Sequence, residues 1–146
     1  MIRAAVFHPD DLENFDPKTK FEDLEKILTA KYDHPAVLMM TVMDGDKVVA
    51  VLGLNEQRPG SCELWLLPCS DLNKYRVSFI KMCRKLIQDF VMEGYGYRRV
   101  EMAVKKDWEM GLLWAETLGF KFSHIAREYA PGEDHVVFYK LRETEE

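Results

Sequence analysis

The stretch from Ser61 to Phe122 constrains the fold of this chain more than any other part of it. A short apolar run, Cys62–Leu67, leads into a long amphipathic segment, then into a second strand-like run, and then into a helical pattern that closes on Leu118-Gly119-Phe120. Glycine directly after a helical pattern favours a left-handed helix end. The order strand, helix, strand, helix predicts an α/β unit at the centre of the fold.

Length and composition indicate one compact domain over residues 1–146, with a frayed tail at 143–146. A chain of 146 residues, 47% hydrophobic and 31% charged, is long enough to bury a substantial core. The formal charge of -5 and the pI near 5.4 argue against a nucleic-acid partner, because phosphate binding requires clustered lysine and arginine. A basic partner fits this charge better.

The cysteines and the hydropathy favour a soluble, cytoplasmic protein. Cys62, Cys69 and Cys83 are odd in number and form no Cys-x-x-Cys pair, which is typical of a reduced compartment. No apolar run resembles a signal peptide or is long enough to cross a bilayer, so we expect no membrane partner. The four histidines show no helical i, i+4 pairing, so we expect no metal site.

The elements before this stretch build an antiparallel meander. Turn residues at 44–46 and 58–61 separate valine-rich runs, and near-continuous hydrophobicity indicates a sheet covered on both faces. The expected elements are a strand at Ile2–Phe7, a helical turn at His8–Phe15, a helix at Phe21–Lys31, and strands at Ala36–Met43 and Lys47–Leu54.

The elements after Leu67 are two helices, one strand and a hairpin. The spacing predicts a helix over Lys74–Glu93 whose sheet-facing residues are Val77, Ile80, Cys83, Ile87, Phe90 and Val91. The remaining expected elements are a strand at Arg98–Val104, a helix capped by Asp107 that ends at Leu118, and a terminal hairpin of Phe120–Ala130 with His135–Leu141.

The order β-α-α-β-β-β-α-β-α-β-β is similar to that of the GNAT (Gcn5-related N-acetyltransferase) superfamily. The segment Trp114–Lys121 also resembles that superfamily's Leu-Tyr-Glu-Lys-Leu-Gly-Phe helix ending. The resemblance implies an α/β fold with a mixed, mostly antiparallel sheet that splays between strands 4 and 5. It also implies acetyl-CoA as cofactor and an amine as acceptor. Homodimerisation is common in the superfamily and is compatible with this sequence.

A narrower resemblance concerns Lys74–Phe79 together with Trp114 and Leu118-Gly119-Phe120. These residues look like the small GNAT-like proteins of short-tailed bacteriophages, which are often labelled internal virion protein A or phage acetyltransferase. That resemblance implies action in the cytoplasm of an infected bacterium, with a host or virion protein as a further partner.

The resemblance also implies a set of cofactor-binding residues. The pantetheine arm would lie along the fourth strand, and the pyrophosphate would sit at the start of the following helix. The family's Gln/Arg-x-x-Gly-x-Gly/Ala pattern is missing there, and Pro68 removes one amide. Cationic side chains could substitute for it. The expected cofactor-binding residues are Leu66, Leu67, Lys74, Arg76, Val77 and Trp108.

Acetyl transfer needs a base for the ammonium and an acid for the departing thiolate. In many members a carboxylate on the fourth strand is the base, which here is Glu63. Beside Trp65 on the same strand face it would be a stronger base, with Glu56 and Glu101 as reserves.

The usual acid is a tyrosine four residues before the glycine of Leu-Gly-Phe, where this chain has Ala115. Tyr75 is our candidate for the acid, with Tyr129 and Tyr139 as alternatives. The other alternative is that the step proceeds without a side-chain acid.

Two functions follow from these observations. The first is an N-acetyltransferase that moves acetyl from acetyl-CoA to an amine of a small molecule or protein. The second is a catalytically degenerate GNAT-fold protein that assists virion assembly or binds a host protein. Three departures from the family pattern support the second: the missing glycines, Ala115 in place of the tyrosine, and Trp108 where the family often has an asparagine that reaches the cofactor.

Overall fold

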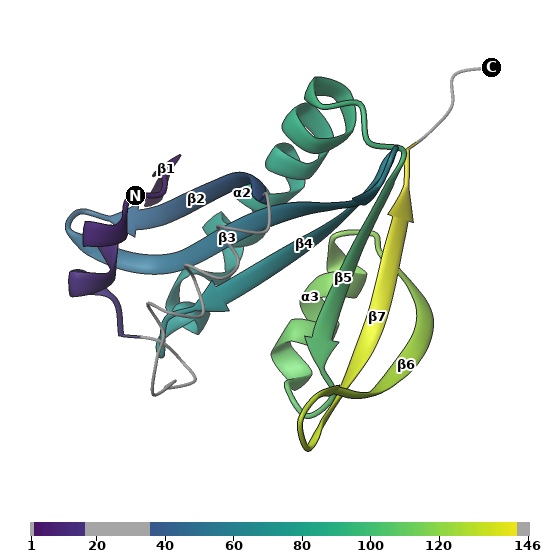
Figure 1. Ribbon diagram of the computed structural model, residues 1–146. Helices are drawn as coiled ribbons and strands as arrows, with labels where there is room; N and C mark the ends of the chain where they lie inside the picture. Colours follow the sequence, from purple (N-terminus) through teal and green to yellow (C-terminus); the bar gives the residue numbers. More distant parts are fainter. Residues whose placement is uncertain (1, 17–35, 143–146) are drawn as a thin grey trace. The chain divides into compact units, whose positions relative to one another are not determined.

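The computed structural model describes residues 2–16 and 36–142 (Figure 1). The helix expected at Phe21–Lys31 and the tail at 143–146 lie outside these residues. The strands form one seven-stranded sheet in the order β1-β2-β3-β4-β5-β7-β6, which confirms the predicted mixed α/β fold. The strands are β1 (Ile2–Val6), β2 (Ala36–Asp44), β3 (Lys47–Arg58), β4 (Ser61–Pro68), β5 (Arg99–Lys105), β6 (Lys121–Ala130) and β7 (Glu133–Leu141).

The chain divides into two compact units. The first comprises Met1–Glu56 and Leu64–Phe79, and the second comprises Gln57–Glu63 and Ile80–Glu146. The prediction of a single domain over residues 1–146 stays a prediction.

The first unit holds the meander of strands. The turn after β2 uses Gly45 with φ of 59°, a left-handed conformation that glycine adopts without strain. In β3 every residue from Val48 to Leu54 is buried. Successive strand residues point to opposite faces, so both faces of the sheet are covered here, as predicted. The core of this unit is Met39, Val48 and Val51, with Leu12, Trp65 and Leu67 among the side chains packed against it.

The second unit contains the start of β4 and the three last strands. Ser61–Glu63 pairs in parallel with Arg99–Glu101, and this short register matches the splay expected between strands 4 and 5. β5 pairs antiparallel with β7, and β7 pairs antiparallel with β6. The helix α3 (Glu109–Thr117) packs against β5 (Figure 1). Gly119 ends that helix with φ of 88°, as the sequence predicts.

The long helix predicted at Lys74–Glu93 is three segments. They are a 3₁₀ turn η2 (Leu72–Tyr75), the α-helix α2 (Arg76–Lys85) and a π-helical segment η3 (Leu86–Gly94). The prediction that Val77 and Phe90 face the sheet is wrong, because they are 64% and 56% exposed. Val77 lies two residues before the buried Phe79, which is the opposite side of an α-helix. The wider π turn carries Phe90 outward and buries Val91.

The predicted cap of α3 is also wrong. Trp108 occupies the N-cap position and Asp107 is exposed, with its carboxylate 3.9 Å from Lys105 Nζ. The indole of Trp108 lies so close to Gly111 that a Cβ there would be 2.3 Å from it. The helix therefore begins by packing an aromatic ring on its own first turn instead of by side-chain capping.

Candidate functional site

A row of polar side chains crosses the second unit on one face of the sheet. Glu63 on β4 is the register partner of Glu101 on β5, and Glu101 is the partner of Tyr139 on β7. Residues opposite one another in adjacent strands point to the same face. The three side chains are half-buried, so they are partly removed from water but can still be reached by a ligand.

Next to this row, Arg99 forms an ion pair with Glu101. The guanidinium donates to Glu101 Oε1 over 3.1 Å, and it lies 4.6 Å from the centre of the Tyr139 ring. The charge of Glu101 is therefore balanced inside the sheet face. Across the described residues, 2–16 and 36–142, Glu63 forms no ion pair, so it is the carboxylate of this row that can receive an external cation.

Glu63 is in contact with the end of the β6–β7 hairpin. The hydroxyl of Tyr129 donates to Glu63 Oε1 over 2.5 Å. Burial raises the pKa of Tyr129 well above its ordinary range, and the hydrogen bond to Glu63 raises it further. The Tyr129 proton is therefore held by Glu63, which makes this phenol a poor acid for a thiolate.

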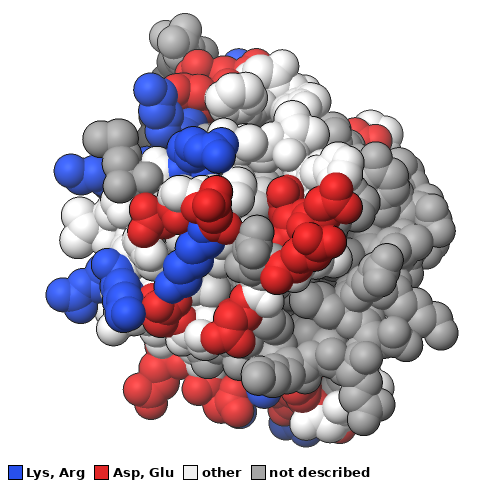
Figure 2. Space-filling view, turned by 90° about the vertical axis from the view of Figure 1, so that its left-hand side faces the viewer, with Lys and Arg blue, Asp and Glu red and all other residues white. Residues whose placement is uncertain are grey.

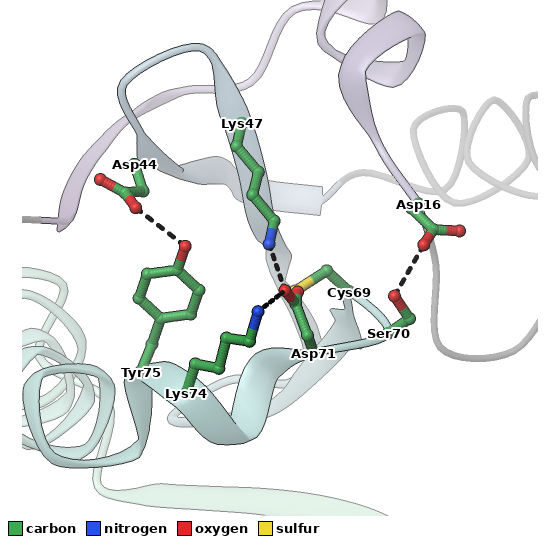
Figure 3. Close-up of polar contacts among 8 residues, drawn as sticks. All are labelled: Asp16, Asp44, Lys47, Cys69, Ser70, Asp71, Lys74 and Tyr75. Carbon is green, nitrogen blue, oxygen red and sulfur yellow. Dashed lines mark hydrogen bonds and ion pairs between the residues drawn. The ribbon is translucent and has the colours of Figure 1, made fainter.

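The loop expected to hold the cofactor phosphates belongs to the first unit (Figure 3). Asp71 lies at its centre. Lys47 Nζ, from β3, lies 2.5 Å from Asp71 Oδ2, and Lys74 Nζ lies 3.3 Å from the same oxygen. The hydrogen bond from Lys47 is the main cause that holds the pKa of Asp71 far below its ordinary range, and a second bond from the Cys69 thiol adds to it. An ionised carboxylate thus already binds the two lysines.

Four backbone amides of this loop are also engaged. The amide of Cys69 donates to the carbonyl of Val49, and that of Ser70 donates to Asp16. The amides of residues 72 and 74 donate to carbonyls within the loop. A pyrophosphate cradle needs amides that point outward. As it is arranged, the loop does not fit a pyrophosphate in the manner of a glycine-rich turn.

Tyr75 and Cys69 each donate a hydrogen bond to an aspartate, Asp44 on β2 for Tyr75 and Asp71 for Cys69. The Tyr75 hydroxyl donates to Asp44 Oδ2 over 2.8 Å, and this bond raises the pKa of Tyr75. Burial, with the hydrogen bond to Asp71, raises the pKa of Cys69 to about 11. Both protons are therefore retained at neutral pH.

The predicted site residues fall into two groups. Lys74, Tyr75, Arg76 and Val77 follow one another on η2 and the start of α2, and the last two are exposed. Leu66 and Leu67 are half-buried on β4 in the same unit, where Leu67 also packs on the core. The other group, in the second unit, is Glu63 and Trp108.

Sequence reasoning missed two participants, Lys47 and Asp71. The sequence indicates Lys47 only as the first residue of a strand, and nothing local links it to a residue 24 positions away. Asp71 carries a usable signal, since an acidic residue stands in a loop where the resemblance implies an anion.

Comparison with solved structures places this architecture among acetyltransferases. An acetyltransferase described as IAA acetyltransferase, from Bacillus cereus, superposes with a TM-score of 0.74 at 14% identity, over 97% of this chain and 100% of that chain. The ribosomal-protein-S18-alanine N-acetyltransferase of Escherichia coli gives 0.73 at 15% identity, over 95% and 92%. The chain has the GNAT fold.

A third neighbour is a Bacillus subtilis acetyltransferase solved in complex with CoA, with a TM-score of 0.71 at 15% identity, over 97% of each chain. At these identities the likeness establishes the GNAT fold alone. No protein-family model matches the sequence, and no curated protein matches it.

Three further observations bear on partners. Figure 2 shows acidic and basic side chains next to one another on the face it presents. No helix within the described part of the chain is long and apolar enough to cross a membrane. The same residues contain no group of three or more His, Cys, Asp or Glu arranged to hold a metal ion.

Proposed function

We propose that this protein is an N-acetyltransferase that moves acetyl from acetyl-CoA to an amine, with Glu63 as the base. The observation that supports it is the Glu63 carboxylate on β4, half-buried and hydrogen-bonded only through Oε1 to Tyr129 among the contacts of the described residues. A carboxylate in this position can bind an alkylammonium and accept its proton. The neutral amine is then the nucleophile.

Acetyl-CoA would supply the activated acetyl group as a thioester. Its phosphates could replace the Asp71 carboxylate between Lys47 and Lys74, and Arg76 is an exposed third cation. The backbone of β4 at Leu66 and Leu67 would face the pantetheine arm, with Val77 and Trp108 as further contacts. Because Asp71 has to release both lysines, donor binding should be weak.

A second function is supported by the loop itself. If Asp71 keeps the lysines, the GNAT fold serves as a binding protein without turnover. A basic host or virion protein then matches the formal charge of -5. The resemblance to proteins of short-tailed phages favours this partner class and the cytoplasm of an infected cell, and a homodimer stays a prediction.

The experiment that separates the two is release of free thiol from acetyl-CoA in the presence of butylamine. An N-acetyltransferase releases thiol in proportion to enzyme and amine. Thiol release that stays at the uncatalysed rate, at donor concentrations up to the millimolar range, would contradict the first function and leave the second.

A further inference from the structure

Tyr129 reaches Glu63 from an unusual piece of backbone. The register of β6 against β7 slips between Ala126 and Ala130, so the intervening residues leave the regular ladder. Within this slip Glu128 has φ of 52°, a left-handed conformation that costs energy for a residue with a side chain.

Two hydrogen bonds hold that conformation. The amide of Glu128 donates to Asp134 Oδ1 over 3.0 Å, and the amide of Gly132 donates to Glu128 Oε2 over 2.9 Å. The hairpin end is therefore fixed by its own side chains, and the following residue, Tyr129, is presented in one direction.

The presented phenol lies between a carboxylate and an imidazole. Its ring centre is 4.6 Å from that of His135, while its hydroxyl donates to Glu63. Tyr129 nevertheless remains 49% exposed, so a ligand from solvent can reach both its ring and the carboxylate that it covers. Nδ1 of His135 is buried and has no hydrogen-bond partner within residues 2–16 and 36–142.

The O–H of a phenol and the N–H of an ammonium compete for the same acceptor. Both donate to a carboxylate oxygen, and the bond from the ammonium is the stronger because both of its partners are charged. An ammonium beside Tyr129 would also gain attraction to the face of the ring. A neutral or anionic ligand would form neither the charge-assisted hydrogen bond nor the cation–π contact.

We propose that Tyr129 is a positioning residue that holds the Glu63 carboxylate until a primary alkylammonium displaces its hydroxyl, with the alkyl chain of the acceptor along the rings of Tyr129 and His135. This rests on the proposed function, since the ligand is its acceptor. It assigns the β6–β7 hairpin as the part of the protein that selects that acceptor.

The first test needs no acetyl donor. Butylammonium is titrated calorimetrically into the full chain and into Tyr129→Phe, which keeps the ring and removes the competing hydroxyl. Binding should tighten roughly tenfold, the worth of one hydrogen bond to a charged group. Tyr95→Phe is the matched control, because Tyr95 is 47% exposed and lies on another part of the unit. Its affinity should equal that of the wild type.

The second test asks whether Tyr129 acts through Glu63. In a Glu63→Gln background, Tyr129→Phe should change butylammonium binding by less than twofold, so the two substitutions are strongly non-additive. A structural role for the tyrosine would give additive effects instead.

Unchanged or weaker binding to Tyr129→Phe, or no binding of butylammonium to any variant, overturns the proposal. Tighter binding without thiol release from acetyl-CoA would uphold the amine site and contradict the N-acetyltransferase function.

Discussion

The row at Glu63 and the loop at Asp71 illustrate two ways in which a carboxylate can be used in one fold. Asp71 lies between Lys47 and Lys74, and its charge is balanced inside the protein. Glu63 is balanced by no cation of the described chain and receives one neutral phenol. A carboxylate with a neutral, displaceable partner is prepared for an external ammonium, whereas a carboxylate paired with two lysines has to be displaced before an external anion can bind them. In the proposed function, the acceptor side is therefore open and the donor side is occupied by Asp71.

The largest effect is expected from Glu63→Gln. The amide keeps the shape of the side chain and cannot accept the proton, so acetyl transfer to butylamine should fall by about 10²–10⁴-fold. Thiol release under saturating amine measures it. Glu116→Gln, at an exposed position on α3, is the control and should retain activity. Equal activity of Glu63→Gln and wild type would contradict the role of Glu63 as the base.

A smaller effect, in the opposite direction, is expected from Asp71→Asn. The substitution removes the internal anion and frees Lys47 and Lys74 for phosphate, so acetyl-CoA should bind roughly tenfold more tightly by calorimetry. Asp46→Asn, at an exposed position in the turn between β2 and β3, should leave donor affinity unchanged. Weaker binding to Asp71→Asn would show that the carboxylate supports the donor site.

The same variant should be less stable, by about 1 kcal/mol at pH 7, because a partly exposed ion pair is lost. The pKa of Asp71 is lowered in the folded state from its ordinary value of 3.8, so its contribution is complete above that value. This contribution to stability is lost as the pH falls through the pKa of Asp71 in the folded state. Thermal unfolding of both proteins between pH 7 and pH 2 checks the sign, since the gap between the two should narrow below about pH 4. A gap that widens in acid contradicts it.

The smallest effect is expected from Tyr75→Phe. The hydroxyl already donates to Asp44, and the raised pKa makes it a weak acid. The turnover number should therefore fall by only a few-fold, far less than for Glu63→Gln. A loss as large as that of Glu63→Gln would identify Tyr75 as the acid that protonates the thiolate.

Much of the fold could be predicted from the sequence because its signals are local. The turn at 44–46, the left-handed Gly119 and the valine-rich β3 each fix an element from neighbouring residues. The π-helical segment could not be predicted, since one extra residue in a turn leaves no mark on the periodicity of so short a helix. It was this segment that reversed the orientation of Phe90.

Individual residues of the candidate site could be predicted from the sequence, but their contacts with distant residues could not. Glu63 follows from its place on the fourth strand. Its partner Tyr129 lies 66 positions away in the sequence. The orientation of Tyr129 depends on a register shift in β6 that the hydropathy pattern does not predict. The sequence also indicates Lys74, but the ammonium group of Lys74 is paired with Asp71. Asp71 in turn binds Lys47, which lies on β3 and is distant in the sequence. Long-range pairing of charges decides what a local motif can bind.

The most direct test of this account is a crystal structure of the protein with acetyl-CoA. The Asp71 carboxylate should have left Lys47 and Lys74, and the phosphate oxygens should contact these two ammonium groups. Phosphates bound by the amides of residues 69–74, with Asp71 still paired to both lysines, would contradict it.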